Sequence, residues 1–333
     1  MNDPIPDGAV LALSGGVGGA KLALGLHHLL PPGQLLVACN TGDDFTHLGL
    51  HVSPDLDTVM YTLAGLNNED LGWGLRGESW NFMDALARLG GPGWFRLGDQ
   101  DLATHVERTT RLSAGQSLSA VTDQLRRRLA IASELLPMTD DRVRTRVGTP
   151  QGWLDFQDYF VRLRCEPRVV ELVFDGAAEA APNPRILAAL ASPGLRAVVI
   201  CPSNPFISIE PMLALPGLRQ ALAATQAPVV AVTPVIGNRA VKGPTAKIMA
   251  ELGLPASPAT AASRYAGLLD AFITDLADPA EPPSTHRAAT LMTTLDSKIL
   301  LARVVLGVAD GVRSEGEASG SLLEKRTKKL LFD

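Results

Sequence analysis

Two stretches of the chain repeat one order of apolar run, tight turn and helical segment, and this order limits the fold more than any other feature. In the first stretch, the apolar run 9–13 is broken by the glycine-rich turn 14–19 (SGGVGG), and a helical segment follows as far as a proline pair at 31–32. A second apolar run, 35–39, comes next. A right-handed crossover makes two such runs parallel strands of a sheet that is covered on both faces.

The same order returns in the last third of the chain. Residues 195–201 and 228–232 have the composition of buried strands, and each precedes a loop and a helical segment. Further strands are predicted at 271–274 and 289–292, with a closing helix at 296–306. We therefore predict an α/β fold, a Rossmann-like three-layer sandwich with a mainly parallel sheet and a smaller, mainly helical insertion.

The predicted domains follow from where this order is interrupted. Residues 1–55 and 146–310 are assigned to a discontinuous α/β nucleotide-binding domain. Residues 56–145 are assigned to the helical insertion, because 108–136 reads as one long helix with mixed charges. Residues 311–333 are charged and rich in lysine, which is typical of a surface tail.

Charge and cysteine content exclude several classes of protein. A net charge of −5 with scattered basic residues argues against a nucleic-acid groove. Cys39, Cys165 and Cys201 lie far apart, so neither a zinc site nor a disulfide framework is indicated, and a reducing cytosol fits this usage. No apolar run reaches the roughly 20 residues that a membrane span needs. We expect a cytoplasmic protein that does not act on membranes.

The candidate ligand-binding loops all follow predicted strands. In an open parallel sheet, ligands bind beyond the carboxyl ends of the strands, so these loops should meet at one crevice. Glycines in the first loop let the backbone approach a phosphate, and a helix N-terminus favours an anion. The spacing matches neither GxGxxG nor GxxxxGK[ST], and a glycine turn is also ordinary packing. The nucleotide or phosphate contacts expected here are Gly15, Gly16, Gly18, Gly19 and Lys21.

Acidic side chains gather after the second predicted strand. Asp43 and Asp44 end the segment NTGDD, and Asp55 and Asp57 follow in PDLDT. Neighbouring carboxylates repel one another unless a cation or hydrogen-bond donors neutralise them. Mg²⁺ is the natural partner when the substrate carries phosphates. The alternative is that Asp43 and Asp55 only cap helices.

Two later loops add donors and cations. Ser203 and Asn204 lie in the rigid turn PSNP, which offers hydroxyl, amide and backbone donors to an anion or is a simple turn. The loop after 228–232 holds Gly237 and Lys242, and the helix after it holds Lys247. These lysines are plausible counter-charges for a phosphate, although a solvated lysine is the commoner explanation for either one.

The middle of the chain holds a second group of polar and aromatic residues. The segment 98–105 (GDQDLATH) places two acids and a histidine at the start of a predicted turn, where a single histidine is more often structural than catalytic. The aromatic residues of this region could stack on a planar ligand or form the core of the insertion. They are Trp73, Trp80, Trp94 and Phe95.

Taken together, these segments resemble the 2-phospho-L-lactate transferase family. The resemblance runs in order through about residues 9–308 and excludes the tail. The segments that carry it are SGGVGGAK (14–21), NTGDD (40–44), SPDLDTVMY (53–61), LGDQDLATH (97–105), LPMTDD (136–141), FQDYF (156–160), PSNP (202–205) and PVIGN (234–238).

The resemblance implies a specific reaction. The family moves a phospho-carboxylate from a guanosine-diphospho donor to the ribityl hydroxyl of the deazaflavin Fo (7,8-didemethyl-8-hydroxy-5-deazariboflavin), releasing GMP, in the biosynthesis of coenzyme F-420. Mg²⁺ is used, and Asp43 and Asp44 match the family's metal-site segment. The residues that contact Fo in the family correspond to Asp57 and Arg96. Lactate, enolpyruvate and glycerate donors all remain open.

Within this resemblance, catalytic roles are expected from two acids. The acceptor is an ordinary alcohol, so a carboxylate within hydrogen-bond reach should orient or deprotonate it, and Asp57 is our hypothesis for that group. Asp43 is expected to act with the metal. The guanine nucleotide is assigned to the glycine loop, the PSNP loop and the Lys242 loop. Glu210 departs from the family, which usually has glycine there.

Two alternatives stay open at the level of sequence. A related group with similar loops looks like nucleotide-sugar-binding regulators, which would bind a ligand without turning it over. The clustered acids of PDLDT and LGDQDLATH favour the transferase over that group. A third interpretation, an NAD-dependent oxidoreductase, suffers from the failed GxGxxG spacing. A homodimer is common for enzymes of this kind.

Overall fold

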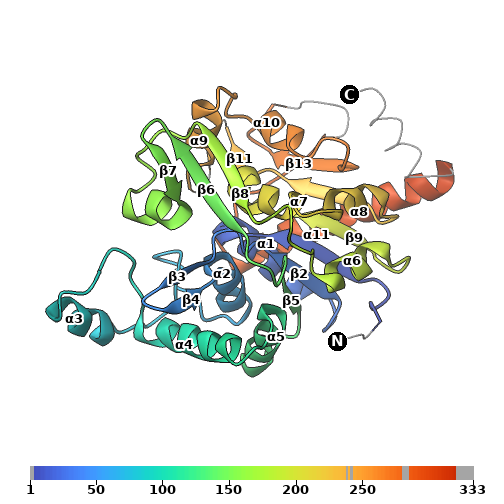
Figure 1. Cartoon of the computed structure of the whole chain (residues 1–333). Coiled ribbons are helices and arrows are strands. Elements are labelled where there is room, and N and C mark those ends of the chain that lie inside the picture. The colour runs from blue at the N-terminus through green and yellow to red at the C-terminus, as the bar shows by residue number, and fades with distance from the viewer. Residues whose placement is uncertain (1–3, 238, 241–242, 280–284, 320–333) are drawn as a thin grey trace.

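A computed structural model describes residues 4–237, 239–240, 243–279 and 285–319. Its centre is a seven-stranded sheet in the order β14-β13-β10-β9-β1-β2-β5, and every neighbouring pair of strands is parallel (Figure 1). The α/β class and the parallel sheet predicted from the sequence are confirmed. The strands are β1 (Val10–Ser14), β2 (Leu35–Cys39), β5 (Glu134–Pro137), β9 (Ala197–Ile200), β10 (Val229–Val232), β13 (Ala271–Asp275) and β14 (Thr285–Ala288).

Helices cover both faces of this sheet and make three layers. Alternate residues of a strand point to opposite faces, so Val10 and Ala12 of β1 belong to one apolar core and Leu11 and Leu13 to the other. The first core lies under α1 (Gly16–Leu29), α2 (Pro54–Leu63) and α11 (Leu295–Ser319). The second lies under α6 (Pro184–Ala191), α7 (Glu210–Leu213), α8 (Leu218–Ala224), α9 (Thr245–Glu251) and α10 (Pro258–Ser263).

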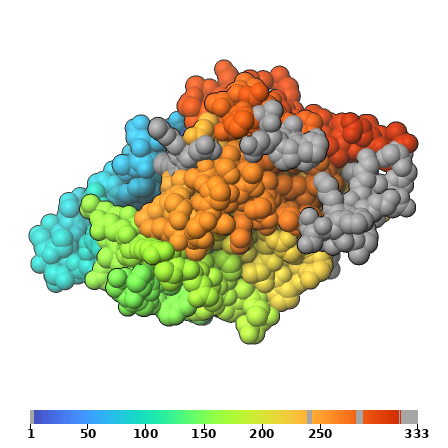
Figure 2. Space-filling view, turned by 90° about the horizontal axis from the view of Figure 1, so that it is seen from above, coloured from blue at the N-terminus to red at the C-terminus, as the bar shows by residue number. Residues whose placement is uncertain are grey.

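The predicted insertion is helical, but its range contains one strand of the main sheet. Residues 108–136 are not one helix, because Gly115 adopts a left-handed backbone (φ +85°) and Ser117 caps a new helix through its side chain. The chain then enters β5, which pairs with β2 at the edge of the sheet. The helices are α3 (Asn81–Arg88), α4 (Asp99–Ser113) and α5 (Leu118–Arg128), and the segment around α3 projects at one end of the molecule (Figure 2).

Short antiparallel sheets lie outside the main one. The hairpin of β3 (Phe45–His47) and β4 (Leu50–Val52) connects β2 to α2. A three-stranded sheet in the order β7-β6-β8 interrupts the range predicted as α/β domain. The remaining elements are β6 (Arg144–Thr149), β7 (Gly152–Asp155), the π-helical turn η1 (Asp158–Arg162), β8 (Glu171–Asp175), the π-helical turn η2 (Pro205–Ile209), β11 (Val235–Ile236) and β12 (Arg239–Ala240).

Two boundaries near the C-terminus differ from the prediction. The last strand, β14, precedes the run predicted at 289–292, and α11 continues beyond residue 306 into the range assigned to the tail. Val305, Leu306 and Ala309 of α11 are buried against the sheet, so packing extends this helix past the point where its composition becomes polar. The division into domains remains a prediction.

Candidate active site

The glycine turn after β1 is bonded directly to the loop after β9. The Gly15 N–H donates to Ser203 Oγ at 3.0 Å, and the Ser203 hydroxyl donates to the Gly15 carbonyl at 2.8 Å. Gly16 has a left-handed backbone (φ +63°), which glycine adopts without strain. A Cβ on Gly18 would overlap the carbonyl oxygen of Pro202. The glycines therefore serve, at least in part, to let these two loops pack closely.

An internal carboxylate lies where this helix would receive an anion. Asp55, in the first turn of α2, accepts a hydrogen bond from the Gly16 N–H at 2.6 Å, at the N-terminus of α1. It also accepts from Asn40 Nδ2 at 3.0 Å and from Ser208 Oγ at 3.2 Å. A phosphate at the predicted contacts Gly15 and Gly16 would therefore have to displace Asp55 and a serine.

Asn40 joins three loops at the strand ends. Besides Asp55, its Nδ2 donates to Asp43 Oδ1 at 3.3 Å and to the Ile207 carbonyl at 3.2 Å, and its Oδ1 accepts from the Gly42 N–H at 2.8 Å. These contacts bring the turn after β2, the start of α2 and the η2 turn together. The predicted convergence of strand-end loops is thus present for Asp43, Asp55 and, through Gly15, Ser203.

The acids at this junction repel one another and are buried. Burial first, and then the charges of Asp55 and Asp44, hold the pKa of Asp43 well above its usual range. Burial also raises the pKa of Asp55 to about 6, although Asn40, Gly16 and Ser208 favour its charged form. Part of the charge is offset by Arg144, whose own pKa is lowered by burial. Additional positive charge would stabilise the cluster.

Asp44 leaves one oxygen without a protein partner. Its Oδ2 accepts from Ser53 Oγ at 2.8 Å and from His51 Nε2 at 3.0 Å. Its Oδ1 is buried and has no hydrogen bond, and the same holds for the hydroxyl of Thr41. Buried polar atoms are almost always satisfied, so unpaired atoms beside carboxylates indicate a place for a ligand.

Asp43 and Asp44 could hold Mg²⁺ only in a site where water and substrate supply most of the ligands. Among the described residues, no group of three or more His, Cys, Asp or Glu side chains is arranged to hold a metal. Mg²⁺ commonly takes only one or two protein carboxylates and completes its shell with water and substrate phosphates. Asp43 and Asp44, with their unfavourable charge and the unpaired Oδ1 of Asp44, suit that kind of site.

Asp57 lies in a neighbouring buried network. Its carboxylate accepts from both terminal nitrogens of Arg108 on α4, with Nη1 at 3.0 Å from Oδ2. His105 Nδ1 lies 3.7 Å from Asp57 Oδ2, and His105 Nε2 lies 3.3 Å from Asp101 Oδ1. The hydroxyl of Tyr61 donates to Asp101 at 2.6 Å. This network connects α2 to α4.

Arg96 and two tryptophans form a separate, partly exposed stack. The Arg96 guanidinium lies 4.1 Å from the centre of the Trp80 ring, and Trp80 meets Trp73 edge to face at 6.1 Å. The other two aromatic residues of the region, Trp94 and Phe95, pack against β3 instead. Trp73 is exposed and Trp80 is half-buried, so this pair presents ring surface that a planar ligand could reach.

Comparison with known proteins decides the family. The family model described as 2-phospho-L-lactate transferase CofD matches residues 10–303. The chain belongs to this transferase family. A "phosphoenolpyruvate transferase" of Streptomyces griseus is 41% identical over 318 residues, which cover 92% of this chain and 99% of the relative. A "2-phospho-L-lactate transferase" of Methanospirillum hungatei is 39% identical over 282 residues, covering 85% and 94%.

A solved structure supports the fold of the transferase. A member of the UPF0052 family from Bacillus halodurans aligns with a TM-score of 0.53 at 14% identity, covering 83% of this chain and 82% of its own. At that identity the likeness concerns the fold alone. Among the described residues of the transferase, no helix combines the length and the apolarity that crossing a bilayer requires.

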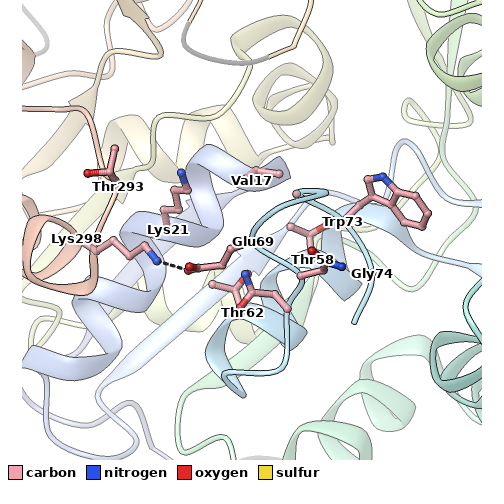
Figure 3. A pocket seen from close by; sticks show the side chains of 12 residues that line it. Val17, Lys21, Thr58, Thr62, Glu69, Trp73, Gly74, Thr293 and Lys298 are labelled. Atoms are coloured by element: carbon pink, nitrogen blue, oxygen red, sulfur yellow. Dashed lines mark hydrogen bonds and ion pairs between the residues drawn. The ribbon is translucent and has the colours of Figure 1, made fainter. Parts of the chain in front are cut away.

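Three predicted contacts of the transferase are hydrogen-bonded to groups outside the acid cluster. Lys21 Nζ donates to the Met292 carbonyl at 2.9 Å and lines a cavity on the flank of α1 (Figure 3). Lys247 donates to the Pro167 carbonyl at 2.9 Å and pairs with Glu251. The N–H of Gly237 is bonded to Asp278 at 2.7 Å. Lys242 lies outside the described residues.

The side-chain amide of Asn204 can still donate a hydrogen bond to a ligand, as predicted. Its Oδ1 accepts from the Phe206 N–H at 3.0 Å, while its Nδ2 is buried without a partner. Arg108 was not among the residues predicted for the site, although Asp101, His105 and Arg108 recur at intervals of four and three residues. This spacing places them on one face of a helix and was the available signal.

Proposed function

We propose that this transferase moves a phospho-carboxylate from a guanosine-diphospho donor to the ribityl hydroxyl of Fo, releasing GMP, in the biosynthesis of coenzyme F-420. Family membership and the names of the relatives support the reaction class. The observation that carries the proposal is the junction at Asn40, which holds Asp43 and Asp55 at the strand ends beside the unpaired oxygen of Asp44. A protein that only bound a nucleotide would have little need to bury three neighbouring acids.

The proposed reaction exchanges one phosphorus–oxygen bond for another. The ribityl hydroxyl oxygen attacks the phosphorus that bears the carboxylate, the bond from that phosphorus to the bridging oxygen breaks, and GMP leaves with the bridging oxygen while the hydroxyl proton is released. Asp43 and Asp44 would hold Mg²⁺, which would supply positive charge for the oxygens of the diphosphate linkage.

Asp57 is proposed to orient the acceptor hydroxyl. Asp57 is 5% exposed and its carboxylate is fixed by Arg108, so it can accept a hydrogen bond in a defined direction. Because the arginine already bonds both oxygens, we assign orientation to Asp57 rather than removal of the proton. Arg96 and its aromatic stack are proposed to meet the planar rings of Fo. Location in the cytoplasm and assembly as a homodimer stay predictions.

The first test replaces the two proposed metal ligands. With Fo, a guanosine-linked donor and MgCl₂, Asp43→Asn and Asp44→Asn should each lower the rate of GMP release about 100-fold or more and raise the Mg²⁺ concentration needed for half-maximal rate. Asp123→Asn is the matched control, since Asp123 pairs with two arginines of its own helix, α5. Unchanged rate and Mg²⁺ dependence in both variants would contradict the metal assignment.

The same assay distinguishes a transferase from a nucleotide-sugar-binding regulator, and it identifies the donor. A protein that only binds would release no GMP from any donor, whereas the transferase produces a phospho-carboxylate ester of Fo. Mass spectrometry of the products from the phospholactate, enolpyruvate and phosphoglycerate donors gives the preferred substrate, because the three esters differ in mass.

A further inference from the structure

A small polar cavity lies beside the strand-end site. It measures about 210 Å³ and is bounded by α1, α2, the segment 67–74 and the start of α11 (Figure 3). Lys21, Thr58 and Lys298 contribute polar groups to its wall. Pockets for drug-sized ligands begin at about 300 Å³, so this cavity suits a smaller group than a tricyclic ring with its ribityl chain.

The position of the cavity connects it to the acids. Thr58 follows Asp57 on α2, and Val17 follows Gly16, whose N–H is bonded to Asp55. A ligand that extended from the acid cluster along the first turns of α1 and α2 would therefore enter this space.

A carboxylate of the protein already lies among the cations of the cavity. Glu69 Oε1 is 2.8 Å from Lys298 Nζ, a contact that crosses from the segment 67–74 to α11 (Figure 3). The hydrogen bond and charge of Lys298, followed by the charges of Lys21 and Arg76, hold the pKa of Glu69 below its usual range. Lys298 thus meets Glu69 directly, and Lys21 and Arg76 add positive charge from two further segments.

The two partners of this ion pair differ sharply in exposure. The side chain of Lys298 is 4% exposed, whereas that of Glu69 is 64% exposed. Glu69 can turn into solvent with little change in its own hydration, because most of its side chain is already exposed. Lys298 cannot leave, and a buried ammonium without a counter-ion is costly. An incoming anion would therefore replace Glu69 rather than add to it.

We propose that this cavity is an anion subsite in which Lys298 and Lys21 bind the carboxylate of the donor's three-carbon group, and that Glu69 occupies it between turnovers. The assignment rests on the proposed function, since the donor's chemistry comes from there. A carboxylate is repelled by the acids around Asp43, so it needs cations elsewhere. The cavity supplies them at a volume that fits three carbons and excludes the guanosine end.

The test uses phosphoenolpyruvate alone as a probe, in equilibrium calorimetry. Lys298→Met should weaken its binding about tenfold or more, because a charged hydrogen bond is lost. Glu69→Gln should tighten binding several-fold, because a competing carboxylate is removed. Lys298→Arg keeps the positive charge and should bind phosphoenolpyruvate within about threefold of the wild-type protein. This variant keeps the test informative if Lys298→Met does not fold. Arg196→Met removes an ion pair with Asp310 elsewhere on the surface and should change nothing.

A binding site predicts weaker phosphoenolpyruvate binding in Lys298→Met and tighter binding in Glu69→Gln. An ion pair that only stabilises the fold predicts no such opposite changes. If Lys298→Met and Glu69→Gln change binding in the same direction or not at all, or if the wild-type protein shows no saturable binding, the inference is overturned. Inorganic phosphate is the second probe: equal binding with equal losses would show recognition of the phosphoryl group and overturn the carboxylate assignment.

The binding experiment needs no turnover, so it is independent of the transfer assay. Opposite shifts without any GMP release would support the subsite while the proposed reaction failed. GMP release without opposite shifts would leave the reaction standing and remove the subsite.

Discussion

Asp55 shows how one residue can decide between two interpretations of a motif. A glycine-rich turn that opens a helix suits a bound phosphate, but here the Gly16 N–H donates to the Asp55 carboxylate. The helix N-terminus and two side-chain donors pay part of the cost of burying this charge, and burial still raises its pKa to about 6. The side chain therefore makes the folded protein sensitive to pH.

The sign of this pH effect follows from the raised pKa. Between about pH 4, the ordinary value, and about pH 6, the folded protein binds the Asp55 proton and the unfolded chain does not. Stability contributed by this group is thus highest at low pH and falls as pH rises through that window, by on the order of 3 kcal/mol. Urea unfolding in EDTA should show a smaller decline for Asp55→Asn. An identical slope in the variant and the wild-type protein would show that Asp55 is not the source.

At the scale of elements, the contact of α1 with α11 depends on one glycine. Gly25 lies in the middle of α1, where a Cβ would overlap the carbonyl of Lys298. Glycine costs about 1 kcal/mol in a helix interior relative to alanine, so its presence here reflects the close approach of the two helices. That approach also places Lys298 at the wall of the cavity.

Gly25→Ala should therefore destabilise the protein despite its better helix propensity. We expect a loss of about 1–3 kcal/mol in the free energy of unfolding from overpacking, measured with urea. Gly307→Ala is the control, because a Cβ on Gly307 in α11 would meet no atom within 4 Å, and the variant should gain up to about 1 kcal/mol in the free energy of unfolding. A stabilising effect at both positions would mean that α11 moves away without cost.

At the scale of the whole molecule, helix α4 is joined to α2, which packs on the central sheet, by a buried ion pair. Arg108 of α4 is fully buried, and its guanidinium bonds Asp57 of α2. The proposed acceptor-binding residues therefore come from two parts of the chain whose relative placement depends on this pair. Retaining it has a cost, since both charges are removed from water.

Breaking the pair from one side should be more harmful than removing both charges. Arg108→Met is expected to lower the free energy of unfolding by about 3–5 kcal/mol, because the Asp57 charge stays buried without its partner. The double variant Asp57→Asn with Arg108→Met should lose less than the sum of the single variants, measured as a double-mutant cycle in urea. Additive losses would show that the two residues do not act as a pair.

Local patterns were sufficient for the first two strands and the turns that follow them. The runs 9–13 and 35–39 correspond closely to β1 and β2, because apolar continuity and the glycine and proline breaks are properties of neighbouring residues. The prediction of one helix across 108–136 was wrong, since a single left-handed glycine and a cap ended it. The closing helix continues past 306 because its later residues are buried.

The amino-acid sequence by itself determined the parallel α/β plan, the order of the polar turns and, through its motifs, the family. Only the tertiary structure decided which side chains meet. Arg108 finds Asp57 across 51 positions, and Lys298 finds Glu69 across 229. The physical reason is that strand and helix periodicity depends on near neighbours, whereas the partner of a buried charge is chosen by packing of distant segments, which no local pattern encodes.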